Sequence, residues 1–352
     1  MLDETVGVCV VIGNQVAARR GELGISPGEF ARRIGISRQA LHAIETGQST
    51  PSVKVALQIA GQLGSTAEEL FGAKTDEPAL DFAPEPGRSY RLAVGYVRDR
   101  LVARRMEAPG GRISGGQSDA LMLDGSITHG AGSGRSIFLS GCDPSLGVLA
   151  DWMSKMDPSN GYRWILSQNS VAKEEVQTGL TNFGLVHSDP SRTHDWLAEG
   201  GFRSVELCTW TISMVVGAGN PKRITSLGAA NSGGYRLARR PDGSGAMSLL
   251  DAELARLGTS LSTLSPTGLP EFPDHRSAAM AIKLGLADYG LVATSIALDE
   301  GLEVIESYEQ KSTLIWADGS NDPVIVERII NELHSNLLSR EVQALPGYAM
   351  AR

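Results

Sequence analysis

Apolar residues at helical spacing form two short stripes near the start of the chain. The stripes consist of Phe30, Ala31 and Ile34, and of Leu41 and Ile44. Ser26 and Ser37 precede them as N-cap residues, and Gly35 and Gly47 follow them at the left-handed position that ends a helix. The pattern predicts two short helices joined by a glycine-containing turn, which is a helix-turn-helix arrangement.

Further helical stripes lie on both sides of this pair. The additional helices are expected over residues 13–22, 51–63 and 65–71. In the second of these, we expect Val53, Leu57 and Ala60 to face the core. Five short helices within residues 1–72 predict a small all-α domain.

The pattern changes after this helical region. Residues 73–88 are rich in proline and acidic side chains, which predicts an extended linker. Residues 90–97 and 101–106 alternate around a polar turn and predict a hairpin, and residues 120–125 predict a further strand. We therefore expect a small β segment over residues 89–135.

From residue 136 onward, short apolar strands alternate with helices. The expected strands are 136–140, 162–166, 183–187, 204–216 and 289–294. The expected helices are 146–156, 170–179, 246–257, 278–286 and 323–338. Residues 314–316 are expected to return the chain from the second lobe to the first. This alternation predicts a parallel α/β sheet, arranged as two α/β lobes over residues 136–352 with the second lobe at about 217–308.

Charge and cysteine content narrow the class of protein. The 352 residues carry a net charge of −8, whereas residues 1–75 hold seven basic and seven acidic side chains. The three cysteines include no C-x-x-C pair, which fits a reducing compartment and argues against a disulfide framework. With no leader-like segment and no apolar run of about 18 residues, we expect a cytoplasmic protein without membrane segments.

The second predicted helix of the pair carries side chains suited to reading DNA. Arg38, Gln39 and His42 point away from the core positions near its start, and Arg and Gln can bind guanine and adenine edges with two hydrogen bonds. The candidate DNA-contacting residues are Ser26, Arg32, Ser37, Arg38, Gln39, His42 and Ala43. A helical protein–protein module is the alternative.

The stretches "ISRQALHAIETGQSTPS", "ALQIAGQLG" and "EELF" resemble the phage-repressor-like (Xre-type) helix-turn-helix family over about residues 12–72. The resemblance implies a double-stranded DNA operator and a homodimer. Many members have a phosphate-binding glutamine just after the first cap, where this chain has Pro27, which lacks a backbone donor.

Turns between strands and helices in the α/β region are the candidate ligand site. In open α/β sheets, ligands lie beyond the carboxyl ends of strands, and helix N-termini favour anions. The candidates from these turns are Ser140, Cys142, Asp143, Ser167, Asn169, Ser170, His187, Ser244, Gly245, His275, Arg276 and Ser277. Arg276 supplies a positive charge, whereas Arg239 and Arg240 are interpreted as a solvated pair.

Residues 136–348 resemble the substrate-binding-like domain that bacteria attach to helix-turn-helix regulators, which has a type 2 periplasmic-binding-protein fold and is related to molybdate-binding proteins. The matching stretches are "SGCDPSLGVLADWM", "GLVHSD", "VVGAGNPKRITSL", "RPDGSGAMSLLD", "LGLADYGL", "GLEVIESYEQ" and "ALPGYAM". The resemblance implies that Tyr289 lines the cleft and that the ligand is an oxyanion, first of all molybdate or tungstate. The family's Gly-Ser-Gly commonly continues with Thr and Arg, but here Ala246 and Met247 follow.

Together these patterns predict a ligand-responsive, sequence-specific DNA-binding transcription regulator. An organic anion or a molybdenum-cofactor-related molecule is the alternative ligand, and lobes that serve only as a dimerisation platform are the alternative architecture. No G-x-S-x-G elbow joins a predicted strand to a helix, because residues 24–28, which have this spacing, lie between two predicted helices. No H-E-x-x-H motif occurs, and the glycine-rich run 130–135 lacks a P-loop ending. We therefore expect no enzyme, no metal site and no cofactor. An enzyme or cofactor-handling protein, distinguished by turnover, is the competing class.

Overall fold

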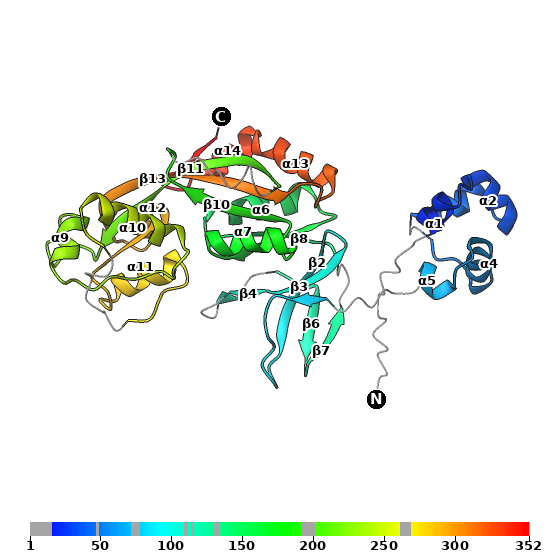
Figure 1. Ribbon diagram of the computed structural model, residues 1–352, viewed down its shortest axis with the longest axis horizontal. Helices are drawn as coiled ribbons and strands as arrows, with labels where there is room; N and C mark the ends of the chain where they lie inside the picture. Colours follow the sequence, from blue (N-terminus) through cyan, green and yellow to red (C-terminus); the bar gives the residue numbers. More distant parts are fainter. Residues whose placement is uncertain are drawn as a thin grey trace. The chain divides into compact units, whose positions relative to one another are not determined.

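The computed structural model describes residues 16–46, 49–71, 78–108, 112–113, 116–129, 134–191, 201–260 and 269–351. The chain divides into two compact units, drawn in Figure 1. Residues 1–77 and 129–131 form one unit, and residues 78–128 and 132–352 form the other. Within the described ranges, the helices are too short or too polar to cross a membrane.

The first unit is built from short helices. They are α1 (Val16–Glu22), α2 (Pro27–Ile34), α3 (Arg38–Glu45), α4 (Val53–Leu63) and α5 (Ala67–Phe71). The hydroxyls of Ser26 and Ser37 accept hydrogen bonds from the backbone N–H groups of Glu29 and Ala40. Gly35 ends α2 in the left-handed region, at φ 73°. The predicted helix-turn-helix is therefore confirmed, with α2 and α3 as its two helices.

One expectation about the core of this unit is wrong. The core includes Phe30, Leu41, Ile44, Ile59, Leu63 and Leu70. Val53 and Leu57 were expected to join it but are 77% and 59% exposed. The buried stripe of α4 passes through Ile59, Ala60 and Leu63, because positions three and four residues apart share a helix face. The predicted helix end at Gly47 lies outside the described residues, and Thr46 caps α3.

The second unit begins with a five-stranded sheet in the order β1-β3-β2-β6-β7. The strands are β1 (Ala79–Leu80), β2 (Tyr90–Val97), β3 (Arg100–Arg105), β6 (Ala120–Leu123) and β7 (Ser126–His129), and a separate pair is β4 (Glu107–Ala108) with β5 (Arg112–Ile113). β2 and β3 form the predicted hairpin. The linker predicted over 73–88 differs in its second half, since β1 pairs with β3 and the Phe82 ring lies 4.8 Å from that of Tyr90.

Two lobes follow the five-stranded sheet. The first contains β8 (Ser136–Gly141), α6 (Ser145–Met156), β9 (Gly161–Leu166), α7 (Asn169–Thr178) and β10 (Phe183–Ser188). The second contains α9 (Leu227–Ser232), α10 (Gly245–Arg256), α11 (His275–Lys283), β12 (Tyr289–Ala293) and α12 (Thr294–Asp299). The antiparallel strands β11 (Phe202–Val216) and β13 (Glu303–Ala317) run through both lobes, as Figure 1 shows.

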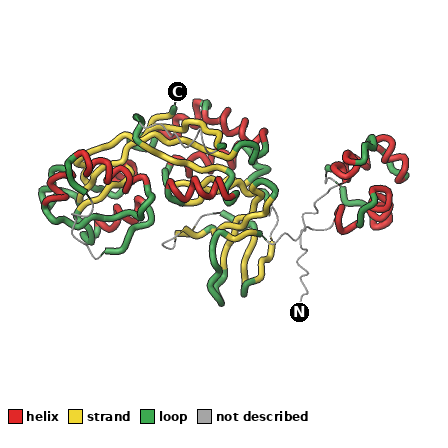
Figure 2. Tube along the Cα trace, in the orientation of Figure 1, coloured by secondary structure: helices red, strands yellow, loops and turns green. Residues whose placement is uncertain are grey.

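The two-lobed α/β architecture is confirmed, with two differences from the prediction. Only β8, β9 and β10 are parallel, whereas β13, β11 and β12 run antiparallel, because the chain crosses between lobes in both directions. The predicted closing helix is two helices, α13 (Pro323–Leu333) and α14 (Asn336–Gln343), since Ser335 caps a new start; β14 (Ala349–Met350) then pairs with β11. Figure 2 shows helices packed on the strands of both lobes.

The five-stranded sheet packs closely on the first lobe. A Cβ atom at Gly95 of β2 would lie 1.8 Å from the carbonyl oxygen of Ser136, so only glycine permits this approach. Phe138 of β8 packs with Ala93 and Val102 in one cluster. The sheet is therefore fixed to the lobe that carries the first half of the candidate ligand site.

Candidate functional site

Helix α3 has one face fixed in the core and the other face in solvent. Leu41 and Ile44 are buried. Among the predicted DNA-contacting residues, the exposed ones are Ser26, Arg32, Ser37, Arg38, Gln39 and His42, and Ala43 is half-buried. A short helix held in this way can present Arg and Gln to base edges in a major groove.

The two lobes touch where α10 begins. A Cβ atom at Gly245 would lie 2.0 Å from Cε1 of His187 on β10, so the helix start and the ring approach closely only because residue 245 is glycine. The Ser170 hydroxyl of the first lobe donates to the Gly243 carbonyl at 3.4 Å. Ser244 caps α10 by accepting a hydrogen bond from the Met247 N–H.

His187 is fully enclosed and hydrogen-bonded at both ring nitrogens. Nδ1 lies 3.0 Å from Oε1 of Gln310, and Nε2 lies 3.3 Å from the Cys142 sulfur. The Asn169 side chain fixes the backbone of residue 187, accepting from its N–H and donating to its carbonyl. Burial lowers the pKa of His187, but Cys142, Gln310 and Asp143 outweigh it, so the net shift is upward.

Arg240 is a buried cation with spare hydrogen-bond donors. Its side chain is 2% exposed, and Nη2 donates to the Pro273 carbonyl at 3.0 Å. Nε and Nη1 have no hydrogen-bond partner among the described residues. Burial lowers the pKa of Arg240, against the opposing effects of Cys142 and Asp274. A guanidinium in this state can bind an anion without first breaking an ion pair.

His275, the first residue of α11, is buried with one free ring nitrogen. Its Nδ1 accepts from the Ala293 N–H at 3.2 Å, so Nε2 carries the proton in the neutral ring. That Nε2 has no partner in the part of the chain that the structure describes. Burial, with the charges of Arg240 and His187, holds the pKa of His275 well below 6.5. His275 is therefore a neutral donor.

These residues form one group between the lobes. Trp210 of β11 lies between the two histidine rings, 5.0 Å from His187 and 5.9 Å from His275. We use the name interlobe site for Cys142, Asn169, Ser170, His187, Arg240, Ser244, Gly245 and His275. Seven of these eight were predicted from the sequence.

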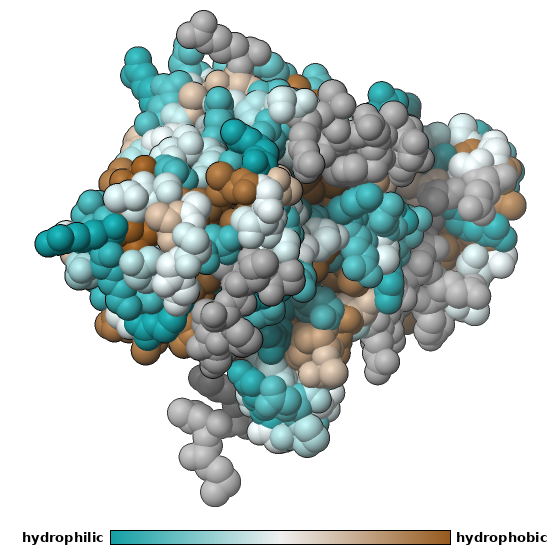
Figure 3. Space-filling view, turned by 60° about the vertical axis from the view of Figure 1, so that its left-hand side comes forward, coloured by the Kyte–Doolittle hydropathy of each residue, from teal (hydrophilic) through white to brown (hydrophobic). Residues whose placement is uncertain are grey.

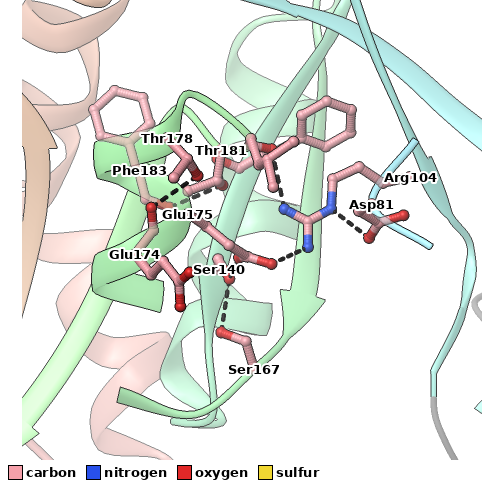
Figure 4. Close-up of polar contacts among 11 residues, drawn as sticks. Asp81, Arg104, Ser140, Ser167, Glu174, Glu175, Thr178, Thr181 and Phe183 are labelled. Carbon is pink, nitrogen blue, oxygen red and sulfur yellow. Dashed lines mark hydrogen bonds and ion pairs between the residues drawn. The ribbon is translucent and has the colours of Figure 1, made fainter. Parts of the chain in front are cut away.

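Ser140 and Ser167 were also predicted to touch ligand, and the structure places them in a different network. Their hydroxyls lie 2.7 Å apart, and Ser140 also donates to Glu175. Figure 4 shows Glu175 bound in turn by Arg104 of β3, which also holds Asp81. These two serines therefore connect the ends of β8 and β9 to the five-stranded sheet.

Three further ligand-site candidates have partners inside the protein. Asp143 uses its carboxylate inside the protein, accepting from Ser312, from the Tyr348 hydroxyl at 2.8 Å and from the Ser145 N–H at 2.9 Å. Arg276 forms ion pairs with Asp299 at 2.8 Å and Glu300 at 2.5 Å. Ser277 completes a capping box with Asp274. The ligand role of these three residues therefore stays a prediction.

Arg240 is the candidate site residue that the sequence interpretation missed. Arg239 forms ion pairs with Asp242 and Glu271 at the surface, as the interpretation of a solvated residue expects. Its neighbour is buried instead, because successive residues of an extended segment point to opposite sides. The sequence signal is that the two arginines are consecutive in an extended segment before the Gly-Ser-Gly turn. Only one of them can then face solvent, and the other faces the interior. Gln310 and Trp210 were missed because they lie on strands that cross between the lobes.

Tyr289, implied by the resemblance, is fully buried at the start of β12. Its hydroxyl has no hydrogen-bond partner among the described residues, and burial raises its pKa to about 12.

On the face drawn in Figure 3, hydrophilic side chains separate small apolar patches. Among the described His, Cys, Asp and Glu side chains, no group of three or more is placed to hold a metal ion.

Comparisons with known proteins cover both units. A helix-turn-helix model matches residues 16–70, and a PBP superfamily domain model matches residues 160–327. An uncharacterised HTH-type transcriptional regulator of Methanocaldococcus jannaschii is 34% identical over 64 residues, which are 18% of this chain and 97% of that protein. One from Methanothermobacter thermautotrophicus is 41% identical over 57 residues, 16% of this chain and 83% of that protein.

The fold of the lobes also has a solved counterpart. It is a protein described as a phosphate ABC transporter substrate-binding protein, from Clostridium perfringens, with a TM-score of 0.51 and 14% identity. The match covers 62% of this chain and 100% of that one, and at this identity it shows the fold alone. The chain belongs to the HTH-type transcriptional regulators and joins a DNA-binding helix-turn-helix to a PBP-like domain.

Proposed function

We propose that this regulator binds its operator as a homodimer and that a small anion held in the interlobe site controls the binding. Helix α3 would enter the major groove, with Arg38, Gln39 and His42 facing base edges. In a two-fold dimer, the two recognition helices would read half-sites about one DNA turn apart. Residues 1–75 have no excess of basic side chains, so affinity would depend on both half-sites together.

The observation that carries the anion proposal is the state of Arg240. A buried charge without a counter-ion costs free energy, and proteins normally pair it. Here Nε and Nη1 of Arg240 and Nε2 of His275 supply three donors without partners among the described residues. An anion would satisfy these donors and neutralise the guanidinium in one step.

The start of α10 supports the same conclusion. Helix α10 begins at Gly245 within the interlobe site, whereas the carboxylate of Asp274 already caps the start of α11. Unpaired backbone N–H groups and the helix dipole favour negative charge at such positions. The similar protein from Clostridium perfringens was solved with phosphate bound to it.

Molybdate and tungstate are our first candidates, on the resemblance of the lobes to molybdate-binding proteins. One guanidinium with neutral donors suits a tetrahedral oxyanion. The same guanidinium can also bind a carboxylate through two hydrogen bonds, which favours an organic anion as the second candidate. Lobes that serve only for dimerisation would leave Arg240 without a function.

Thermal unfolding of the purified protein tests the proposal directly. The panel contains molybdate, tungstate, sulfate, phosphate and several carboxylates. A ligand at about a hundred times its Kd stabilises the folded state by roughly 2.7 kcal/mol, which moves the midpoint visibly. We expect a shift with one class of anion and recovery of that anion unchanged. Turnover would indicate an enzyme, and no shift with any anion would favour the dimerisation platform.

A further inference from the structure

The sulfur of Cys142 has an environment that anion binding does not explain. Cys142 lies between β8 and α6 and is 5% exposed. Its sulfur is 3.3 Å from Nε2 of His187. A thiol this close to an imidazole nitrogen has a base that can take its proton.

The hydrogen bonds around Gln310 determine which nitrogen of His187 is the base. Nε2 of Gln310 donates to the Glu309 carbonyl at 2.8 Å, so its Oε1 is the atom that faces Nδ1 of His187. Because an amide oxygen only accepts, Nδ1 must carry the proton. The lone pair of Nε2 is then directed at the Cys142 sulfur. Nucleophile, base and orienting amide lie in sequence, as in enzymes with an activated cysteine.

Several titratable groups lie around the Cys142 sulfur. Arg240 is a neighbouring cation, and His187 becomes one when it takes the thiol proton. Asp143, the adjacent carboxylate, accepts hydrogen bonds from Ser312, Tyr348 and the Ser145 N–H, which disperse its charge. The remaining titratable neighbours are the neutral His275 and the Tyr348 hydroxyl.

Cys208 provides a comparison within the same protein. It is fully buried, and its sulfur lies 3.5 Å from the Ser145 hydroxyl and 3.9 Å from Asp143. Burial and the charge of Asp143 raise the pKa of the Cys208 thiol. Two buried cysteines therefore differ in one respect that matters for reactivity, which is the presence of a base.

We propose that Cys142 is a peroxide-reactive thiol, with His187 as its base and Gln310 as the residue that positions the base. The Cys142 thiolate attacks one oxygen of hydrogen peroxide, a sulfur–oxygen bond forms and the oxygen–oxygen bond breaks. The departing hydroxide takes the proton from His187 and leaves as water. Sulfur loses two electrons and peroxide gains them, giving a sulfenic acid.

The geometry favours a small oxidant and gives the product a place to bind. The close approach of Gly245 to His187 limits the space around the sulfur, so hydrogen peroxide can reach it more readily than a bulky electrophile. The product oxygen would lie near the unpaired donors of Arg240 and His275. This reaction needs no bound anion, so it stands apart from the anion proposal.

The test compares the two buried cysteines in full-length protein carrying Cys9→Ser. After brief exposure to hydrogen peroxide, intact mass and a sulfenic-acid-specific label report oxidation of the starting protein and of its Cys142→Ser and Cys208→Ser variants. We expect one added oxygen in the starting protein and in Cys208→Ser, and loss of this product in Cys142→Ser. The rate at Cys142 should exceed that at Cys208 by at least about tenfold.

A second pair of variants tests whether His187 activates the Cys142 thiol or whether peroxide only has better access to its sulfur. Gln310→Leu removes the acceptor for Nδ1 and should slow oxidation at least about tenfold, whereas Gln310→Glu keeps an acceptor there and should retain the rate. Equal rates at the two cysteines, or no effect of Gln310→Leu, would each overturn the proposal.

Discussion

At the scale of single residues, Arg240 combines a positive charge with deep burial. Its side chain is 2% exposed, yet Nε and Nη1 have no partner among the described residues. Arginine is rarely buried without a pairing carboxylate or phosphate. The proposed anion would resolve this conflict, so the stability of the protein without anion is informative.

We predict that Arg240→Met stabilises the anion-free protein and abolishes its response to anions. Removing an unpaired buried charge should raise the free energy of unfolding, on the order of 1 kcal/mol. Thermal scans with and without the active anion measure both effects. Arg239→Met is the matched control, because Arg239 pairs outward with Asp242 and Glu271, and it should keep the anion response. An anion shift that survives in Arg240→Met would remove this residue from the site.

At the same scale, Arg38 tests the DNA-reading surface. It is exposed on α3 while Leu41 anchors the opposite face, so Arg38→Ala should leave the fold intact. We expect operator binding to weaken by about 1–3 kcal/mol with relaxed preference at one base pair. Binding measured over a set of single-base operator variants checks this, and unchanged affinity with unchanged preference would contradict it.

His275 links the interlobe site to pH. Burial and two nearby charges hold its pKa well below 6.5, so below about pH 6.5 the unfolded chain binds more protons at this residue than the folded protein does. The free energy of unfolding must then fall through this residue as pH is lowered from about 7 to 5. His275→Asn, which can still accept from the Ala293 N–H, should show a weaker fall.

Denaturant unfolding of both proteins at pH 7, 6 and 5 measures the difference. The raised pKa of His187 contributes with the opposite sign, because its stabilisation is lost as pH rises through the folded-state value. His187 is present in both proteins, so the difference isolates His275. A steeper fall in His275→Asn than in the unchanged protein would show that the sign is wrong.

At the scale of elements, the contact between the five-stranded sheet and the first lobe depends on Arg104. Its guanidinium binds Asp81 at 2.9 Å, Glu175 at 2.5 Å and the Leu180 carbonyl at 3.0 Å. Figure 4 shows Arg104 between Asp81 and Glu175. Arg104 and Glu175 are both buried. One side chain from β3 therefore joins α7 to the segment that follows β1.

We predict that Arg104→Met destabilises the second unit by about 3–5 kcal/mol, because Glu175 is left as an unpaired buried charge. Adding Glu175→Leu should restore part of that loss, which a double-mutant cycle of denaturant unfolding would measure. Arg203→Met breaks the exposed pair with Asp318 and serves as the control, with little expected change. Equal effects of the two arginine changes would contradict the account.

Elements that depend on local chemistry were predictable from the sequence, and those that depend on long-range pairing were not. Ser26 and Ser37 predict where α2 and α3 begin, and Gly35 predicts where α2 ends, because capping acts within a few residues. β13 was recognised only over residues 314–316, since its first half is polar and gains its partners from β11. The exposed Val53 and Leu57 show that an apolar stripe does not by itself fix which face is buried.

The same distinction holds for the interlobe site. Turns between strands and helices pointed to Cys142, His187 and Gly245, because ligand sites follow from topology in such folds. The true environment of Arg240 and Arg276 required knowing which carboxylates lie near them. Glu300 and Asp299 pair with Arg276, and this pairing across elements leaves no trace in the sequence around either residue.

At the scale of the whole molecule, the account requires that anion binding and DNA binding influence each other. The two units are parts of one chain, and the proposed anion would bind to the second of them. An anion can change operator affinity only by as much as it prefers one arrangement of the dimer over another, typically about 1–3 kcal/mol. By reciprocity, operator DNA must change the affinity for the anion by the same factor.

The most direct test of this coupling is the affinity for a selected operator, measured by fluorescence anisotropy with and without the anion that shifts thermal unfolding. Salt is held constant, and Arg240→Met is measured alongside. The account predicts a change in Kd of about fivefold or more in the unchanged protein and none in Arg240→Met. The same Kd in both conditions, with the anion shown to be bound, would contradict the claim that this protein is an anion-responsive regulator.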